Sequence, residues 1–243
     1  MATLVVGASG ATGRLLVEQL LSRGQQVRAI VRAPEPFRRL FENNENLSVI
    51  PGSILELSDG ELARHVDGCE AVASCLGHNL SLKGIYGEPR RLVTEAVNRL
   101  CTAIGESQPA RPVRFVLMNT TGNRNRDLSE PVSLAQKAVM GLIRLLLPPH
   151  LDNEQAADFL RTRIGQGDGV IEWAVVRPDT LIDESVVTEY AVHPSPIRSA
   201  IFDAGKTSRI NVAHFMADLI TDNGGWLKWK GQMPVVYNVD GSL

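Results

Sequence analysis

Cysteine, aromatic residues and an excess of one charge are all scarce in this sequence. The 3 cysteines, Cys69, Cys75 and Cys101, have no metal-ligand spacing, so we expect neither a disulfide framework nor a metal site. Lysine and arginine number 25 against 27 acidic residues, which leaves no dense basic face for nucleic acid. No apolar run reaches the roughly 18 residues that a membrane span needs.

The sequence also shows no basic and apolar leader, because Met1 is followed at once by a β-rich run. Together with reduced thiols, this predicts a cytoplasmic protein. The 243 residues, 44% of them hydrophobic, favour one well-buried α/β domain spanning 1–243 over two full domains.

Short β-rich runs alternate with helical patterns along the chain. This alternation predicts a doubly wound, mostly parallel sheet with right-handed crossovers. The expected strands are 3–6, 26–31, 47–51, 71–75, 113–118 and 172–177, with 235–239 as a last edge strand. The first expected helix follows the first strand and ends at Gly24. The other expected helices are 36–44, 59–66, 86–104, 132–147 and 212–221.

A glycine-rich turn, Gly7-Ala-Ser-Gly10-Ala-Thr-Gly13, joins the first strand to the first helix. Gly7 permits a sharp turn, Gly10 lets backbone N–H groups approach a pyrophosphate, and Gly13 lets the helix lie close to the strand. The helix then directs the positive end of its dipole toward the anion. The turn therefore predicts a dinucleotide-binding site; the alternative is a tight turn without a ligand.

In a doubly wound sheet, ligands bind over the carboxyl ends of the strands. The residues that follow the expected strands are therefore the candidate cofactor contacts. They are Gly7, Ser9, Gly10, Ala11, Thr12 and Gly13 after the first strand, Arg32 after the second, Ser53 and Ile54 after the third, Leu76, Gly77 and His78 after the fourth, Asn119 and Thr120 after the fifth, and Pro178 after the sixth.

Arg32 occupies the position that distinguishes the two dinucleotides. About 20 residues after the glycines, NAD sites place Asp or Glu at the ribose hydroxyl, whereas NADP sites place Arg at the extra phosphate. No acidic residue precedes Glu35 in this stretch. Arg32 therefore favours NADP(H), with Arg38 and Arg39 as further candidate cations. The alternative is that Arg32 is a solvated loop residue.

Several segments resemble the atypical short-chain dehydrogenase/reductases, with most similarity to the NmrA-like and biliverdin reductase B (flavin reductase) group. They are the glycine turn, Val31-Arg32, Val175-Val-Arg-Pro178 and Ser208-Arg-Ile-Asn-Val-Ala213. The resemblance runs from residue 3 to about residue 221. It implies a Rossmann-type fold with NADP(H) in an extended pose and a small C-terminal substrate region, with substrate-side elements over about 120–155 and 178–210.

The Tyr-x-x-x-Lys pair of the wider superfamily is absent. The residues four positions after Tyr86, Tyr190 and Tyr237 are arginine, proline and glycine. Hydride transfer to an ordinary carbonyl needs a proton donor for the oxygen, so this absence argues against alcohol dehydrogenases and against epimerases and dehydratases built on that pair.

The resemblance also implies catalytic residues. The family's serine at the end of the fifth strand corresponds to Thr120 or Thr121, and we assign Thr121 as the catalytic hydroxyl. The family's histidine falls on Glu154, which becomes the candidate proton donor. His150, four residues earlier, is a second candidate, although an isolated surface histidine is more often structural.

Two functions fit these features. The first is an NADP(H)-dependent oxidoreductase that transfers hydride to a small, planar, conjugated acceptor such as a flavin, quinone or tetrapyrrole, where a solvent proton can complete the reaction. The second is a non-catalytic NADP(H)-binding redox sensor or regulatory protein. An isomerase or lyase that uses the cofactor transiently has little support.

Three other features have alternative interpretations. The expected helix 132–147 has one apolar face, which packs on the body or else forms a lid, a homodimer face or a membrane-surface contact. The polar loop 122–127 binds an anionic substrate through Arg124 or Arg126, or is simply hydrated. Cys75 is a buried small hydrophobe or a redox-active thiol.

Overall fold

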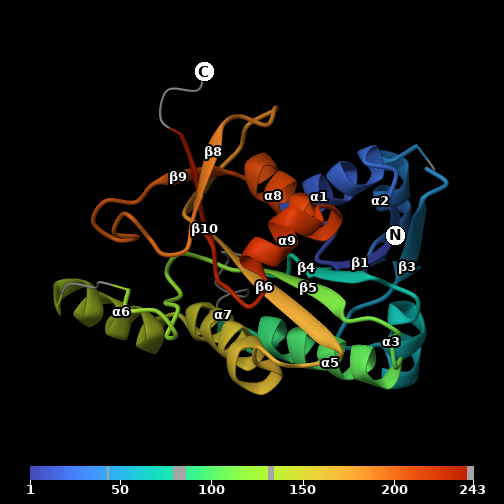
Figure 1. Ribbon diagram of the computed structural model, residues 1–243, viewed down its shortest axis with the longest axis horizontal. Helices are drawn as coiled ribbons and strands as arrows, with labels where there is room; N and C mark the ends of the chain where they lie inside the picture. The colour runs from blue at the N-terminus through green and yellow to red at the C-terminus, as the bar shows by residue number, and fades with distance from the viewer. Residues whose placement is uncertain (43, 79–85, 131–133, 240–243) are drawn as a thin grey trace.

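The computed structural model describes residues 1–42, 44–78, 86–130 and 134–239. An eight-stranded sheet forms its centre, and all neighbouring strands are parallel except the last pair (Figure 1). The predicted α/β, mostly parallel fold class is therefore confirmed. In spatial order the strands are β3 (Leu47–Pro51), β2 (Gln26–Val31), β1 (Ala2–Val6), β4 (Ala71–Ser74), β5 (Val113–Met118), β6 (Ile171–Pro178), β10 (Val235–Asn238) and β8 (Tyr190–His193).

The strand order reverses at β1, which lies between β2 and β4. The connections from β1 and from β4 therefore leave in opposite directions, and their carboxyl ends leave room for a ligand between them. Both strands are apolar along nearly their whole length, and Leu4, Val5 and Val6 are at most 1% exposed. Such continuous apolar runs are typical of parallel strands that are covered on both faces.

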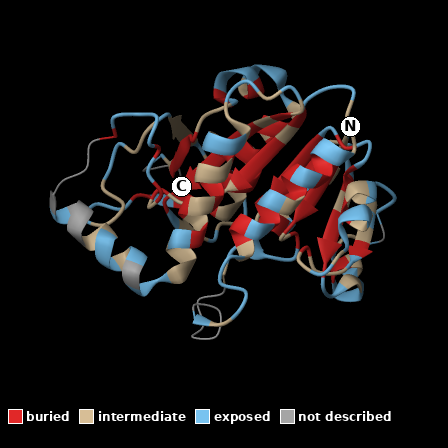
Figure 2. Cartoon of the chain, turned by 90° about the horizontal axis from the view of Figure 1, so that it is seen from below, coloured by how far each residue is buried: buried red, intermediate tan, exposed pale blue. Residues whose placement is uncertain are grey.

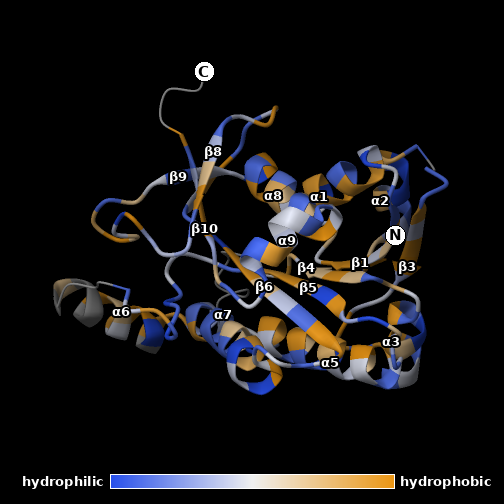
Figure 3. Cartoon of the chain, viewed as in Figure 1, coloured by the Kyte–Doolittle hydropathy of each residue, from blue (hydrophilic) through white to orange (hydrophobic). Residues whose placement is uncertain are grey.

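Helices cover both faces of the sheet (Figure 1). The buried strands lie between helices whose outer sides are exposed (Figure 2), and the apolar helix faces turn toward the sheet (Figure 3). One face carries α1 (Ala11–Ser22), α2 (Pro34–Leu40), α8 (Arg209–Thr221) and α9 (Asn223–Trp229). The other carries α3 (Asp59–Val66), α5 (Leu92–Glu106) and α7 (Pro148–Phe159), which continues into a π-helical turn at Leu160–Ile164.

The sheet differs from the sequence prediction at its C-terminal side. β10 was expected as an edge strand, but β8 pairs with it in antiparallel orientation and forms the edge. A separate two-stranded sheet, β7 (Thr180–Ile182) with β9 (Lys206–Ser208), was also missed. These strands are short and mostly half-buried, so they have no apolar alternation that a sequence pattern could show.

Some helix ends also differ from the prediction. α2 begins at Pro34, two residues earlier than expected, because proline fits the first turn of a helix. α5 begins at Leu92, later than the expected 86, and the expected helix 132–147 appears as α6 (Leu134–Leu146). Residues 132 and 133 lie outside the described residues.

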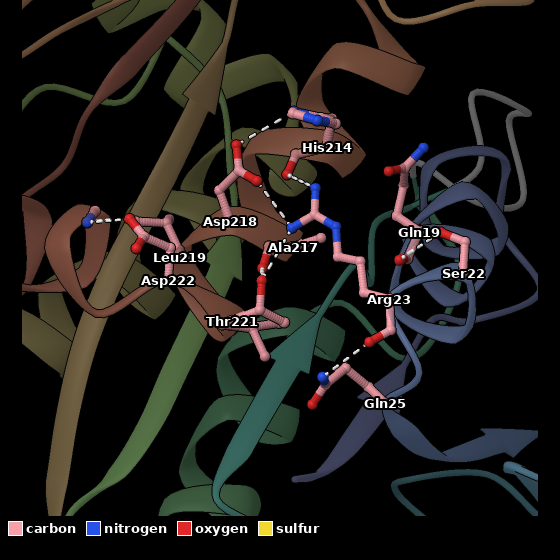
Figure 4. A network of polar contacts seen from close by, with 12 residues as sticks. Gln19, Ser22, Arg23, Gln25, His214, Ala217, Asp218, Leu219, Thr221 and Asp222 are labelled. Atoms are coloured by element: carbon pink, nitrogen blue, oxygen red, sulfur yellow. Dashed lines mark hydrogen bonds and ion pairs between the residues drawn. The ribbon is translucent and has the colours of Figure 1, made fainter.

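Polar contacts join α1 to α8 at the outer surface (Figure 4). Arg23, at the end of α1, places Nη1 2.8 Å from Oδ1 of Asp218 and donates a 3.0 Å hydrogen bond to Thr221. Asp218 also lies 3.2 Å from Nδ1 of His214, one turn earlier on α8. This network fixes the helix that follows the glycine turn against the C-terminal part of the chain.

Arg177 fixes the loop that follows β5. Its side chain is fully buried in β6 and pairs with Glu130 at 2.7 Å. The same guanidinium donates to the carbonyl oxygens of Asn123 and Met233. Because one buried cation binds both ends of 123–130, that loop has a defined position beside the end of β5.

We expect Arg177→Ala to lower the free energy of unfolding by about 3–5 kcal/mol, because it leaves the Glu130 carboxylate buried without its partner. Urea denaturation of the variant and the wild type measures this loss. The double variant Arg177→Met/Glu130→Leu should lose less, since no unpaired charge remains; an equal loss would contradict the electrostatic reason.

Candidate functional site

A cavity of about 770 Å³ lies over the carboxyl ends of the strands around the point where the strand order reverses. This volume is in the range of small-molecule and cofactor pockets. Of the predicted cofactor contacts, Gly7, Ser9 and Gly10 line it after β1, and Arg32 lines it after β2. Ser53 and Ile54 follow β3, and Leu76, Gly77 and His78 follow β4, on the same cavity.

The glycine turn forms one wall by close approach of backbone to backbone. Gly7 has φ +71°, and a Cβ there would lie 2.6 Å from the carbonyl carbon of Cys75. A Cβ on Gly13 would overlap the carbonyl oxygen of Gly7. Gly10 occupies the N-cap position of α1, where no side chain accepts a hydrogen bond from the first turn of the helix. Gly7 and Gly10 therefore border the cavity with backbone alone, and this open wall at the start of α1 fits a pyrophosphate.

Other predicted contacts do not line this cavity. Ala11, Thr12 and Gly13 form the first turn of α1, whose start they position. Asn119, Thr120 and Pro178 lie at the ends of β5 and β6, farther across the sheet. Sequence reasoning also missed part of the wall, which includes Gly52, Leu55, Glu56, Gly87, Glu88 and Pro89.

The predicted cations separate into two groups. Arg32 lies in the cavity wall, and no carboxylate pairs with it in the part of the chain that the structure describes. Arg38 is bound instead to Glu35 and to the carbonyl oxygen of Val49. Arg39 does not line the cavity. Arg32 is therefore the cation that can meet an anionic group here.

Arg99, from α5, shapes the part of the wall that follows β3. It donates 2.6 Å to the carbonyl oxygen of Ile54, and also to the carbonyl oxygen of Leu57 and to Asp59. The residues it binds lie about 40 positions away in sequence. Nothing local in the sequence could show this contact.

Asp152 connects the loop after β4 to two helices. Its buried carboxylate accepts from the backbone N–H groups of Val93 and Thr94, at 2.8 and 2.9 Å, and so caps α5 from α7. The same carboxylate lies 2.7 Å from Nε2 of His78, a residue of the cavity wall. This cap from a distant helix explains why the start of α5 was misplaced by sequence reasoning.

Cys75 lies in the cavity wall, at the end of β4. Burial raises the pKa of its thiol to about 12, so the thiol stays protonated at neutral pH. This supports the interpretation of Cys75 as a small apolar residue over a redox-active thiol.

Thr120 and Thr121 follow β5 and have different surroundings. Thr121 is 7% exposed, its backbone N–H donates to Pro178, and its hydroxyl contacts Asp179. The Thr120 hydroxyl accepts from the backbone N–H of Gly122 at 3.2 Å. Thr120 is thus the less enclosed of the two hydroxyls.

Glu154 was expected to donate a proton, and the structure makes it an ionised carboxylate instead. Arg144 of α6 binds both its oxygens through Nε and Nη2, at 2.7 to 3.0 Å. Nε2 of His150, one turn earlier on α7, lies 3.3 Å from Oε1. Burial alone raises the pKa of Glu154, but hydrogen bonds and charges of His150 and Arg144 outweigh it and lower this pKa to about 2.

The helix α6 extends beyond the sheet edge and packs mainly on α7 (Figure 1). Leu142 and Leu146 are 56% and 51% exposed, so the expectation that this apolar face packs against the body is wrong for these residues. In the preceding loop, Arg126 lies 2.9 Å from Asp158, whereas Arg124 is exposed.

A family model described as NAD(P)H-binding matches residues 7–223. The match starts at the glycine turn and covers every strand of the parallel part of the sheet except β1 and β10. The chain belongs to this NAD(P)H-binding family. A nicotinamide dinucleotide is therefore its cofactor class, and the glycine cradle fits the pyrophosphate of such a cofactor.

Solved structures of related fold support the same architecture. An anaerobillin reductase of Escherichia coli O157:H7 superimposes with a TM-score of 0.69 at 16% identity, over 100% of both chains. A short-chain dehydrogenase/reductase of Veillonella parvula gives 0.70 at 16% identity, over 100% of this chain and 96% of the other. A candidate NADH-flavin reductase of Streptococcus pneumoniae gives 0.67 at 17% identity, over 98% and 100%. At these identities the likeness shows the fold.

An uncharacterized chloroplastic protein of Arabidopsis thaliana is 39% identical over 74 residues, which are 30% of this chain and 26% of that protein. The match thus spans about a quarter of the relative's length, and the cytoplasmic location of the present chain stays a prediction. Among the described helices, none is both long and apolar enough to cross a membrane. Within the same residues there is no cluster of three or more potential metal ligands.

We expect Glu154→Gln to reduce the fall in the free energy of unfolding that the wild type shows as the pH is lowered. Because the pKa of Glu154 is about 2 when folded against 4.5 in a model peptide, its contribution is complete above about pH 4.5 and is lost as the pH falls toward 2. The difference is at most about 3 kcal/mol. Urea denaturation at pH 2 to 6 tests this, with Glu18→Gln on the exposed side of α1 as control; parallel pH curves for Glu154→Gln and wild type would contradict it.

Arg99→Gln should weaken binding of either dinucleotide by roughly tenfold, about 1.4 kcal/mol. The reason is that the loop after β3 loses the hydrogen bonds from the Arg99 guanidinium to the carbonyl oxygens of Ile54 and Leu57. Isothermal titration with NADPH and with NADH measures this effect. Arg111→Gln, at an exposed position outside the cavity, should bind as the wild type does. An unchanged Kd in the Arg99 variant would show that the loop holds its shape without the guanidinium.

Proposed function

We propose that this protein is an NADPH-dependent reductase that delivers hydride to a small, planar, conjugated acceptor such as a flavin, quinone or tetrapyrrole. The observation that carries the cofactor assignment is Arg32, a cation in the cavity wall at the end of β2. The carboxylates of the wall, Glu56 and Glu88, come from other loops, so no acidic side chain stands at the end of β2 where NAD sites place one.

The cavity residues divide among the parts of the cofactor. The backbone of the glycine turn and the start of α1 hold the pyrophosphate, and Arg32 binds the 2′-phosphate and stacks on adenine. Ser53 and Ile54 enclose the adenosine end, and the loop 76–78 leads toward the ends of β5 and β6. Bound NADPH supplies a hydride, which carries two electrons.

In this proposal the acceptor lies over the ends of β5 and β6. The segments of about 120–155 and 178–210 flank it, and both belong to the same single domain as the cofactor site. Thr120 contributes a hydroxyl there in place of Thr121, whose hydroxyl contacts Asp179. Arg124 is the candidate for an anionic group of the acceptor, because Arg126 is already paired with Asp158. The lack of a Tyr-x-x-x-Lys pair favours a conjugated acceptor over a simple carbonyl.

We expect Arg32→Glu to weaken NADPH binding by about 1.5–3 kcal/mol while NADH binding changes little, because only NADPH carries the phosphate that a charge-assisted hydrogen bond would hold. Isothermal titration with both dinucleotides measures the difference. Arg39→Glu makes the same charge change outside the cavity and should leave both affinities near those of the wild type. An equal loss for both dinucleotides would contradict the NADPH assignment.

Turnover is tested by NADPH oxidation, followed by its absorbance, with a panel of flavins, quinones and linear tetrapyrroles. Steady oxidation with at least one acceptor supports the reductase. Tight binding that discriminates NADPH from NADP⁺ without any turnover would support the redox sensor in its place.

A further inference from the structure

His150 lies beside the turn that follows β5. A Cβ built on Gly122 would lie 3.1 Å from Cε1 and 3.6 Å from Nδ1 of the imidazole, and 3.7 Å from the hydroxyl of Thr120. The absence of a side chain at Gly122 therefore makes room for the ring. The imidazole and the Thr120 hydroxyl both border Gly122, although they come from elements about 30 residues apart in sequence.

The other side of the same ring faces a fixed charge. Nε2 of His150 is buried and lies 3.3 Å from Oε1 of Glu154. Arg144 holds the Glu154 carboxylate through two nitrogens, so the carboxylate cannot rotate away. Since Nε2 faces Glu154, the ring presents Nδ1 and Cε1 to the Gly122 side.

We propose that His150 is the proton donor of the reduction, and that Glu154 and Arg144 are the residues that position it. The proposal rests on the proposed function. A hydride adds two electrons to the acceptor, and the acceptor atom that gains the charge takes the proton from Nδ1 of the His150 imidazolium. The imidazole then regains a proton from water. The balance is NADPH + acceptor + H⁺ giving NADP⁺ + reduced acceptor.

The chemistry of the three side chains fits this role. A carboxylate 3.3 Å from Nε2 selects the ring orientation, and a general acid needs a defined orientation. The carboxylate stays ionised itself, so Glu154 acts on the ring and does not transfer the proton. The arrangement places the donor one helical turn before the position at which the sequence alone located it.

The kinetic test compares His150→Ala with the wild type on an acceptor that the wild type reduces. We expect kcat to fall by about 10²-fold or more while the Kd for NADPH stays within about twofold, because the ring acts on the acceptor side. Added imidazole should restore part of the rate. His65→Gln, on α3 and outside the cavity, is the matched control and should retain wild-type kcat.

A second readout needs neither cofactor nor turnover. Nitrogen-15 NMR of the ligand-free protein, at a pH where the ring is neutral, should show His150 as the Nε2–H tautomer, since the Glu154 carboxylate lies 3.3 Å from that nitrogen. Glu154→Leu should remove this preference, and Gly122→Ala should shift the ring signals by displacing the imidazole. A wild-type Nδ1–H tautomer would overturn the assignment of the proton-donating atom.

The outcomes separate the two proposals. An active wild type with unchanged kcat in His150→Ala, or a loss that imidazole does not rescue and that follows lost NADPH binding, overturns the role of His150 and leaves the reductase standing. A wild type that reduces no acceptor overturns the proposed function and this inference together.

Discussion

The close approach of the glycine turn to its neighbours is the constraint on which the site depends. A side chain on Gly13 would overlap the Gly7 carbonyl oxygen, and one on Gly7 would collide with the backbone of Cys75 and Leu76. Because α1 and the end of β4 both approach β1 this closely, their backbone groups and the wall of the cavity come together. The network around Arg23 and Asp218 then fixes the far end of α1 to α8.

Buried charged groups organise the other half of the molecule. Asp152 caps α5 and binds His78, Glu154 binds Arg144 and faces His150, and Glu130 binds Arg177. Burying such groups is costly unless their partners are in place, so each pair ties one loop or helix to one position. These paired charges position α5, α7 and the loops after β4 and β5, whereas the glycine turn owes its close packing to the absence of side chains.

The cavity wall could be predicted from sequence to a large extent, and the contacts around α7 could not. Gly7, Ser9, Gly10, Arg32 and the loops after β3 and β4 were placed on one cavity because each follows a strand, and parallel strands end at one edge. The pairing of Glu154 with Arg144 could not be foreseen, because Arg144 comes from another helix. β8 was missed because a short, half-buried strand has no apolar alternation.

The sequence by itself determined the alternating strands and helices, the glycine turn and the cation at the end of β2, because these are local signals of spacing and residue type. Only the tertiary structure decided that Asp152 caps α5, that Arg99 holds the loop after β3, and that the His150 ring lies against Gly122. Each of these contacts joins residues about 30 to 60 positions apart, and their distance is set by how helices pack on the sheet.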